Sequence, residues 1–243
     1  MAISQRLLET IERKQSNLTL AADTTDADHL IDLAEQLGEH ICMLKTHIDM
    51  IGRYTPSLPK KLQAIAKQAD FLLFEDRKFA DIGHTTYHQY TGGPYRLSEW
   101  ADLVTVHALP GPGILEAIAP ICREQQRGVL LLIEMSSAGN LLTESYQQRA
   151  LEMAQPYHDI IAGVIAQRKP LTSHPWLTCT PGVKIAAGQD SMGQRYNDPK
   201  TAIMEHHSDV IIVGRGITEA DHPKQMAAHY QQVGWQYRQQ ASR

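Results

Sequence analysis

The sequence predicts an α/β protein folded as a closed (β/α)₈ TIM barrel with a parallel eight-stranded sheet. Three observations lead to this prediction. Short apolar runs alternate with amphipathic helical patterns along the chain, which is typical of a parallel sheet joined by helices. Eight such runs can be counted, and eight strands close this kind of sheet. The 243 residues also match the roughly 250 residues of one barrel, so we expect one domain over residues 1–243.

Each predicted strand is a short apolar run that ends in polar or charged residues. The strands are expected at 17–22, 41–44, 71–75, 102–107, 128–135, 160–166, 176–180 and 210–213. Apolar residues three or four apart predict the helices between them. These helices are expected at 3–14, 27–38, 57–69, 85–100, 113–124, 143–154 and from 221 to the end.

Local signals support the ends of several elements. Residues 24–26 offer side-chain oxygens that can cap the helix 27–38, and Pro59 lies at the entrance of the helix 57–69. The run T-G-G-P at 91–94 should interrupt the helix 85–100. The connection 167–175 is short and proline-rich, so it should hold no full helix.

Composition excludes several classes of function. The net charge is −4 and no block of lysine or arginine stands out, which argues against binding to nucleic acid or to an anionic membrane. The three cysteines are widely spaced and indicate neither a disulfide framework nor a zinc site. No segment resembles a signal peptide or a run of about 18 apolar residues. We therefore expect a soluble, cytoplasmic protein.

The densest group of charges lies at residues 71–85, F-L-L-F-E-D-R-K-F-A-D-I-G-H-T. An apolar strand runs directly into Asp76 and Lys78, and Asp81 follows three residues later. Strand ends carry the active site in a parallel barrel, and a lysine among carboxylates stays protonated. The sequence thus indicates a proton donor at the mouth, whereas the alternative is a solvated charged loop.

Residues far apart in the sequence should become neighbours at the mouth of the barrel. They are Asp23, Lys45, Asp76, Lys78, Ser136 and Arg215. The run V-G-R-G at 213–216 follows the last strand, where barrels often bind phosphate, although it could also be a structural turn. The segment 182–199 is either a lid or a disordered surface loop. His47 and His107 have no metal-ligand spacing and are interpreted as packed or supporting side chains.

These residues and several longer motifs resemble the orotidine 5′-phosphate decarboxylase family in its eukaryotic-type form. The motifs are M-L-K-T-H-I-D at 43–49, F-L-L-F-E-D-R-K-F-A-D-I-G at 71–83, Y-R-L-S-E-W-A-D at 95–102, A-Q-R at 166–168, T-P-G-V at 180–183 and I-I-V-G-R-G at 211–216. They extend from about Leu20 to Trp235. D-x-K-x-x-D alone is shared with related phosphosugar barrels, but the longer run around it is specific.

The resemblance implies a role for each matched position. Asp76 and Lys78 would flank the reacting carbon, while Asp81 and Thr85 would come from the partner subunit of a homodimer. The other implied contacts are Asp23 and Lys45 on the ribose, Ser136 or Ser137 on the pyrimidine, Pro181 beside the substrate, and Gln194, Tyr196, Gly214 and Arg215 on the phosphate.

The implied reaction removes CO₂ from orotidine 5′-phosphate and gives uridine 5′-phosphate without a cofactor or metal. The chain starts too late to include a fused phosphoribosyltransferase domain, so we expect a free-standing decarboxylase. Two alternatives are a metal-dependent phosphosugar decarboxylase or aldolase on the same barrel and a non-catalytic nucleotide-binding protein. Lys45 at the mouth disfavours a nearby cation, and the complete charged set disfavours the second alternative.

Overall fold

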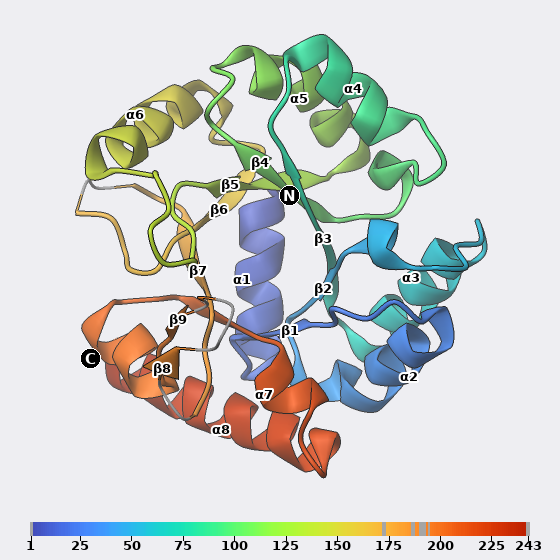
Figure 1. Cartoon of the computed structure of the whole chain (residues 1–243), viewed down its shortest axis with the longest axis vertical. Coiled ribbons are helices and arrows are strands. Elements are labelled where there is room, and N and C mark those ends of the chain that lie inside the picture. The colour runs from blue at the N-terminus through green and yellow to red at the C-terminus, as the bar shows by residue number, and fades with distance from the viewer. Residues whose placement is uncertain (1, 172–173, 186–187, 190–192, 194, 242–243) are drawn as a thin grey trace.

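A computed structural model of the chain contains a closed barrel of eight parallel strands surrounded by helices (Figure 1). The structure describes residues 2–171, 174–185, 188–189, 193 and 195–241. The barrel strands are β1 (Leu18–Ala21), β2 (Met43–Thr46), β3 (Leu72–Phe79), β4 (Leu103–His107), β5 (Gly128–Leu132), β6 (Ile161–Ile165), β7 (Leu177–Pro181) and β10 (Val210–Val213). Pairing of β1 with β10 closes the sheet. The predicted barrel is confirmed.

Helices follow most of the strands and cover the outside of the barrel. They are α2 (Ala27–Leu37), α3 (Leu58–Ala69), α4 (Gly83–Thr91), α5 (Gly113–Gln125), α6 (Glu144–Ala154), α7 (Arg215–Thr218) and α8 (Pro223–Ala241). As predicted, the described residues between β6 and β7 contain no helix. Within the part of the chain that the structure describes, no helix combines the length and apolar character needed to span a membrane.

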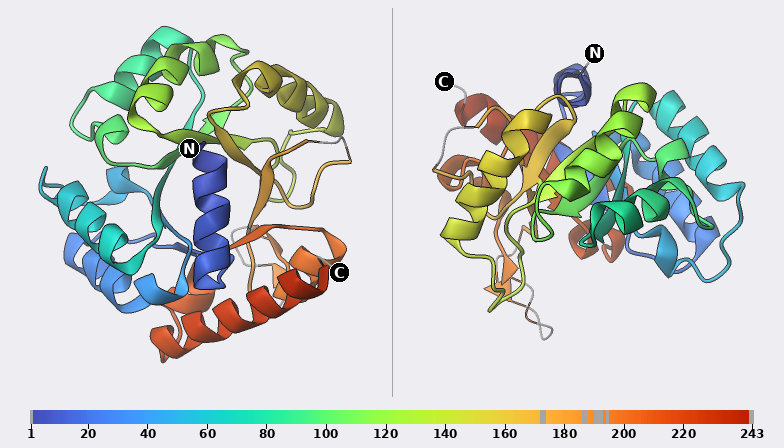
Figure 2. Two further views of the ribbon diagram at one scale, coloured as in Figure 1. Left: turned by 180° about the vertical axis from the view of Figure 1, so that it is seen from behind. Right: turned by 90° about the horizontal axis from the view of Figure 1, so that it is seen from above.

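The first helix, α1 (Ile3–Lys14), lies across one end of the barrel, while the β8 (Gly188–Gln189) and β9 (Arg195–Tyr196) hairpin projects at the other (Figure 2). Ile3, Leu7 and Ile11 of α1 are buried among inward-facing strand residues. Gly128 permits this contact, because a Cβ there would lie 2.4 Å from Cγ2 of Ile3. The helix therefore closes the amino-terminal end of the barrel and leaves the opposite end as the mouth.

A second, larger core lies between the outer face of the sheet and the surrounding helices. In β3, Leu73 belongs to this outer core, whereas Leu72 and Phe74 belong to the inner one. This alternation follows from the two-residue period of a strand. Continued along β3, it directs Glu75 outward and Asp76 inward to the mouth.

The predicted end of the third strand was wrong. β3 continues through the charged residues to Phe79, and its register with β4 shifts between Glu75 and Phe79. Backbone amides here find partners in β4, including the hydroxyl of Thr105, which accepts from the N–H of Lys78 at 2.8 Å. Charge does not end a strand whose polar side chains point into a pocket.

Three other predicted boundaries differ from the structure. The helix expected at 85–100 begins at Gly83 and ends at Thr91, and a separate 3₁₀ turn forms at Leu97–Glu99; the predicted interruption is thus confirmed. The strand expected at 128–135 ends at Leu132. In the run G-R-G, expected to be a phosphate-binding segment or a structural turn, Arg215 begins the short helix α7.

Candidate active site

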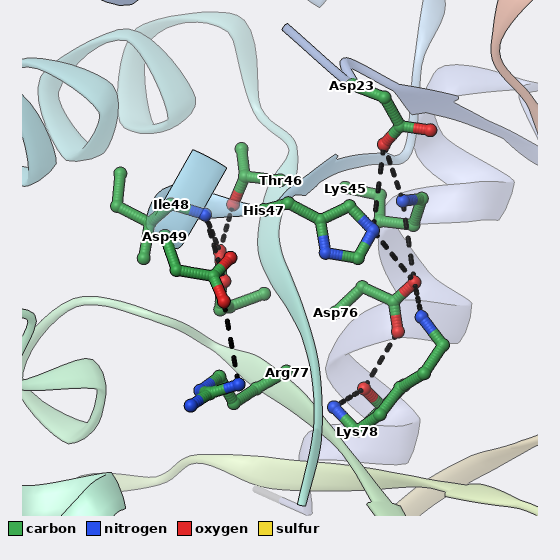
Figure 3. Close-up of polar contacts among 11 residues, drawn as sticks. Asp23, Lys45, Thr46, His47, Ile48, Asp49, Asp76, Arg77 and Lys78 are labelled. Atoms are coloured by element: carbon green, nitrogen blue, oxygen red, sulfur yellow. Dashed lines mark hydrogen bonds and ion pairs between the residues drawn. The ribbon is translucent and has the colours of Figure 1, made fainter. Parts of the chain in front are cut away.

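Two lysines and two aspartates meet at the inner side of the mouth (Figure 3). The ammonium of Lys45, at the end of β2, lies 2.7 Å from Oδ1 of Asp23 and 3.4 Å from Oδ2 of Asp76. The ammonium of Lys78 lies 2.6 Å from the same Oδ2 of Asp76. Three neighbouring segments of the barrel therefore supply an alternating chain of charges: Asp23, Lys45, Asp76 and Lys78.

Asp76 is the centre of this array. Burial by itself would raise the pKa of Asp76, but the hydrogen bond from His47 and the charges of Lys45 and Lys78 hold the pKa well below its usual range. Thr105 donates to the second carboxylate oxygen at 2.8 Å. A carboxylate with this many donors stays ionised at neutral pH.

Lys45 owes its charge to the same neighbours. The lysine is buried, and burial by itself would lower its pKa; the charges of Asp76 and Asp23 outweigh this effect and raise the pKa of Lys45. Its ammonium is fixed at the pocket wall. Lys78 is more exposed than Lys45, with 33% of its side chain accessible, so a bound molecule can reach its ammonium.

The backbone of Lys78 is strained. Its φ of 51° lies in the left-handed region, which a residue with a Cβ adopts at a cost of about 1 to 3 kcal/mol. The register shift between β3 and β4 surrounds this residue. Such strain is found at functional sites, and here it directs the Lys78 ammonium back onto Asp76.

The charged array forms one wall of a cavity of about 330 Å³. The predicted site residues that line the cavity are Asp23, Lys45, Asp76, Lys78, Ser136, Pro181, Tyr196, Gly214 and Arg215. Apolar side chains of Phe74, Leu132 and Ile165 form the floor. A charged wall above an apolar floor suits a flat polar ring held next to reacting groups.

Arg215 and Tyr196 lie at another wall of the cavity, and a second cation, Lys184, lies outside the cavity lining next to Tyr196. Arg215 donates a hydrogen bond to the hydroxyl of Tyr196, and its guanidinium lies 5.8 Å from the centre of the Tyr196 ring. The ammonium of Lys184 lies 5.7 Å from the same ring. Gly214 lines the cavity beside them, so this wall has the charge to hold a small anion.

The chain matches the orotidine 5′-phosphate decarboxylase / HUMPS family over residues 16–230. The chain belongs to this family. It is 44% identical to orotidine 5′-phosphate decarboxylase of Rhizopus oryzae, with 96% of this chain and 89% of that protein aligned. It is 40% identical to the decarboxylase of Schizosaccharomyces pombe, with 98% and 91% aligned. The predicted family is confirmed.

Two further similarities agree with this family. Uridine 5′-monophosphate synthase of Bos taurus is 40% identical over 96% of this chain, which spans 49% of that protein. The structure of orotidine 5′-monophosphate decarboxylase from Methanocaldococcus jannaschii, complexed with the inhibitor BMP, superimposes with a TM-score of 0.70 at 21% identity, covering 89% of this chain and 97% of that one. At this identity the second match supports the fold.

Two residues predicted from the decarboxylase family do not line this cavity. Asp81 and Thr85 lie outside it, Asp81 is exposed, and its carboxylate accepts from the N–H of Ile82 at 2.7 Å. This placement leaves both residues available to another subunit, so their predicted role across an interface stays a prediction. Gln194 lies outside the described residues. Ser136 and Ser137 both line the cavity.

Two further polar residues lie beside Asp76: His47, which the sequence indicated only as a packed or supporting side chain, and Thr105, for which the sequence indicated no site role. His47 places its Nε2 3.4 Å from Oδ2 of Asp76 and 3.8 Å from Oδ1 of Asp23, and Thr105 bonds Asp76 directly. Thr105 carried a signal, since it is a hydroxyl at an inward position of a strand. Among the described residues no group of three or more histidine, cysteine, aspartate or glutamate side chains could hold a metal ion.

Proposed function

We propose that this chain decarboxylates orotidine 5′-phosphate to uridine 5′-phosphate and CO₂, a step of pyrimidine nucleotide synthesis, with residues 1–243 acting as one catalytic domain. The observation that carries the proposal is the array of Asp23, Lys45, Asp76 and Lys78 in a cavity of a member of this family. The cationic wall at Arg215 lies in the same cavity, so one ligand with a phosphate and a polar ring can contact both.

Lys78 acts as the proton donor in this proposal. As the bond between carbon 6 and the carboxylate breaks, the electron pair stays on carbon 6, and the ammonium of Lys78 stabilises it and then transfers a proton to it. The resulting neutral amine is reprotonated from solvent. Asp76, ionised beside Lys78, repels the substrate carboxylate. This repulsion ends when the carboxylate leaves as neutral CO₂.

The remaining wall residues bind the parts of the substrate that do not react. Asp23 and Lys45 hold the ribose hydroxyls, Ser136 contacts the pyrimidine, and Pro181 packs beside it. Tyr196, Gly214 and Arg215, together with Gln194, hold the phosphate. Binding energy from the phosphate can then be used to stabilise the transition state at carbon 6.

The active unit is proposed to be a homodimer in which Asp81 and Thr85 of one subunit complete the site of the other. Apolar side chains close to them in the sequence support this arrangement, because Ile82 and Tyr87 are 64% and 37% exposed. Neighbouring apolar residues of this size at a surface favour contact with another protein. A two-fold axis there would place two composite sites at one interface.

The decisive experiment follows the absorbance of orotidine 5′-phosphate in the presence of purified protein and a chelator. We expect the absorbance to fall at the same rate with and without chelator, because Lys45 and Lys78 already place positive charge at the site. A rate lost in chelator and restored by Mg²⁺ would move the assignment to a metal-dependent phosphosugar enzyme. No absorbance change under either condition would exclude the decarboxylase.

A further inference from the structure

A buried carboxyl group lies directly behind the charged array and takes no part in the proposed reaction. Glu75 of β3 has no exposed surface. Its Oε2 accepts from the hydroxyl of Thr46 at 2.6 Å, and its Oε1 accepts from the backbone N–H of Ile48 at 3.0 Å. One side chain thus holds both residues that flank His47.

Strand geometry places this contact on the opposite side of the barrel wall from the site. Thr46 and Glu75 are direct partners in the pairing of β2 with β3, and each is adjacent in sequence to a charged residue that faces the mouth. Figure 3 shows Thr46 and Ile48 on one side of β3, and His47, Lys45 and Asp76 on the other. A contact on the outer side can therefore fix groups on the inner side without touching substrate.

The contact has the properties of a rigid clamp. A buried carboxyl that lost its donors would be left with a large desolvation cost, so the chain from Thr46 to Ile48 has little freedom to move. Among nearby charged groups, Asp49 opposes the ionisation of Glu75 and Lys45 favours it. The next residue of the loop, Asp49, is also held to β3, because its Oδ2 forms an ion pair with Nη1 of Arg77 at 3.5 Å.

We propose that Glu75 is a positioning residue, which holds Thr46 and Ile48 so that the imidazole between them, His47, points at Asp76 and Asp23. The His47 ring itself lies next to these two carboxylates, with Nε2 at 3.4 Å from Asp76 and 3.8 Å from Asp23. The kinetic consequence rests on the proposed function, whereas the position of the imidazole does not. Glu75 acts on the reaction through His47, and through His47 on Asp76.

A double-mutant cycle tests this coupling. Glu75→Met removes both acceptor oxygens at similar length, Glu75→Gln keeps an acceptor and the shape, and His47→Ala removes the imidazole. We expect Glu75→Met and His47→Ala each to lower kcat/KM about tenfold or more, and Glu75→Gln to keep it within about threefold. The double variant should be within about twofold of His47→Ala. Effects that multiply would overturn the proposal, because Glu75 would then act independently of His47.

Two further variants guard against loss of folding. Thr46→Val removes only one arm of the clamp and should lower kcat/KM in the same direction, while Thr46→Ser, which keeps the hydroxyl, should not. Asp102→Asn alters a buried carboxyl at the other end of the barrel and should leave kcat/KM unchanged. If Thr46→Val and Thr46→Ser behaved alike, the clamp would be excluded as the source of the effect.

A measurement without substrate separates this proposal from the proposed function. The imidazole NMR signals of His47, assigned by their loss in His47→Ala, should shift in Glu75→Met and Thr46→Val and stay in place in Asp102→Asn. If the native protein does not decarboxylate orotidine 5′-phosphate, the proposed function fails and these signals still decide the clamp. Unchanged signals in both clamp variants would overturn the positioning role.

Discussion

Each end of this barrel contains a buried aspartate between two cations. The two aspartates nevertheless have different roles. At the mouth, Asp76 lies between Lys45 and Lys78 at 3.4 and 2.6 Å. At the closed end, Asp102 lies between Arg6 and Arg127 at 2.9 and 2.7 Å. The side chains of both aspartates are nearly buried, at 12% and 8% exposed.

The type of cation beside each aspartate explains why the two roles differ. Asp102 joins α1 to the start of β5 through two guanidinium groups that never lose their proton, and it also accepts from the N–H of Leu73 at 2.9 Å. Asp76 pairs with lysines, which can transfer a proton, and it borders an open cavity. The same charge pattern therefore joins two elements where its donors are arginines, and it is a reactive group where one of its donors is a lysine that can transfer a proton to a bound molecule.

Lys78→Ala gives the largest expected effect and tests the mouth. Turnover should fall by at least about 10³-fold, because the ammonium stabilises charge that develops only during reaction, while product nucleotide should still bind. The free energy of unfolding should change less than in Asp102→Asn. Steady-state kinetics, calorimetric titration with uridine 5′-monophosphate and urea denaturation measure the three quantities. A variant that kept most of its turnover would remove Lys78 from the chemistry.

Mixing two inactive variants tests whether the mouth, unlike the closed end, needs a second subunit. Lys78→Ala and Asp81→Ala should each be nearly inactive, but in a mixed dimer one site contains both lesions and the other contains neither. With free exchange at equal amounts, half of the dimers are mixed and half of their sites intact, so activity should approach roughly a quarter of the native value.

The control for this experiment is a mixture in which native mass spectrometry detects the mixed dimer. Activity that stays at the level of the parent variants in such a mixture would exclude Asp81 from the site of the partner. A protein that is monomeric at the assay concentration would exclude the shared site altogether.

Asp102→Asn tests the closed end. Removal of one partner from a buried ion pair leaves two guanidinium groups without their counter-charge, and we expect a loss of roughly 3 kcal/mol in the free energy of unfolding. At temperatures well below melting, kcat/KM for orotidine 5′-phosphate should stay at the native value. A fall in kcat/KM without loss of stability would show that the two ends are coupled, and the comparison above would fail.

Glu75 gives the smallest expected change per step of the experiment, one pH unit, and extends the comparison to a carboxyl without a bound cation. Burial raises its pKa to about 8, whereas an unfolded chain gives a glutamate pKa near 4.3. The folded state then holds the extra proton between these values, so its contribution to stability is complete below the unfolded pKa and is lost as the pH rises toward the folded pKa.

We therefore expect the stability of the native protein, relative to Glu75→Gln, to fall on the order of 1 kcal/mol per pH unit between about pH 5 and 8. Urea denaturation of both proteins across this range measures it, and the groups common to both cancel. A difference that does not change with pH would mean that the bonds from Thr46 and Ile48 keep Glu75 ionised.

Periodicity and strand count were enough to predict the barrel. A chain that alternates apolar strands with amphipathic helices has few arrangements that bury the apolar side chains of both. The same logic brought Asp23, Lys45, Asp76, Lys78 and Arg215 to one end, since parallel strands share a carboxyl edge. Prediction failed at the end of β3. Neither the register shift nor the left-handed backbone of Lys78 has a local signature, as both depend on how β4 pairs with β3.

By itself, the sequence determined the fold class, the family and which charged residues face the mouth, because these depend on side-chain type and on a period of two. Only the tertiary structure decided which partner each charge receives. The sequence does not show that Glu75, Asp76 and Asp102 take different hydrogen-bond and ion-pair partners. Distance to a lysine, an arginine or a backbone N–H separates them, and that distance is set by the packing of strands that lie far apart along the chain.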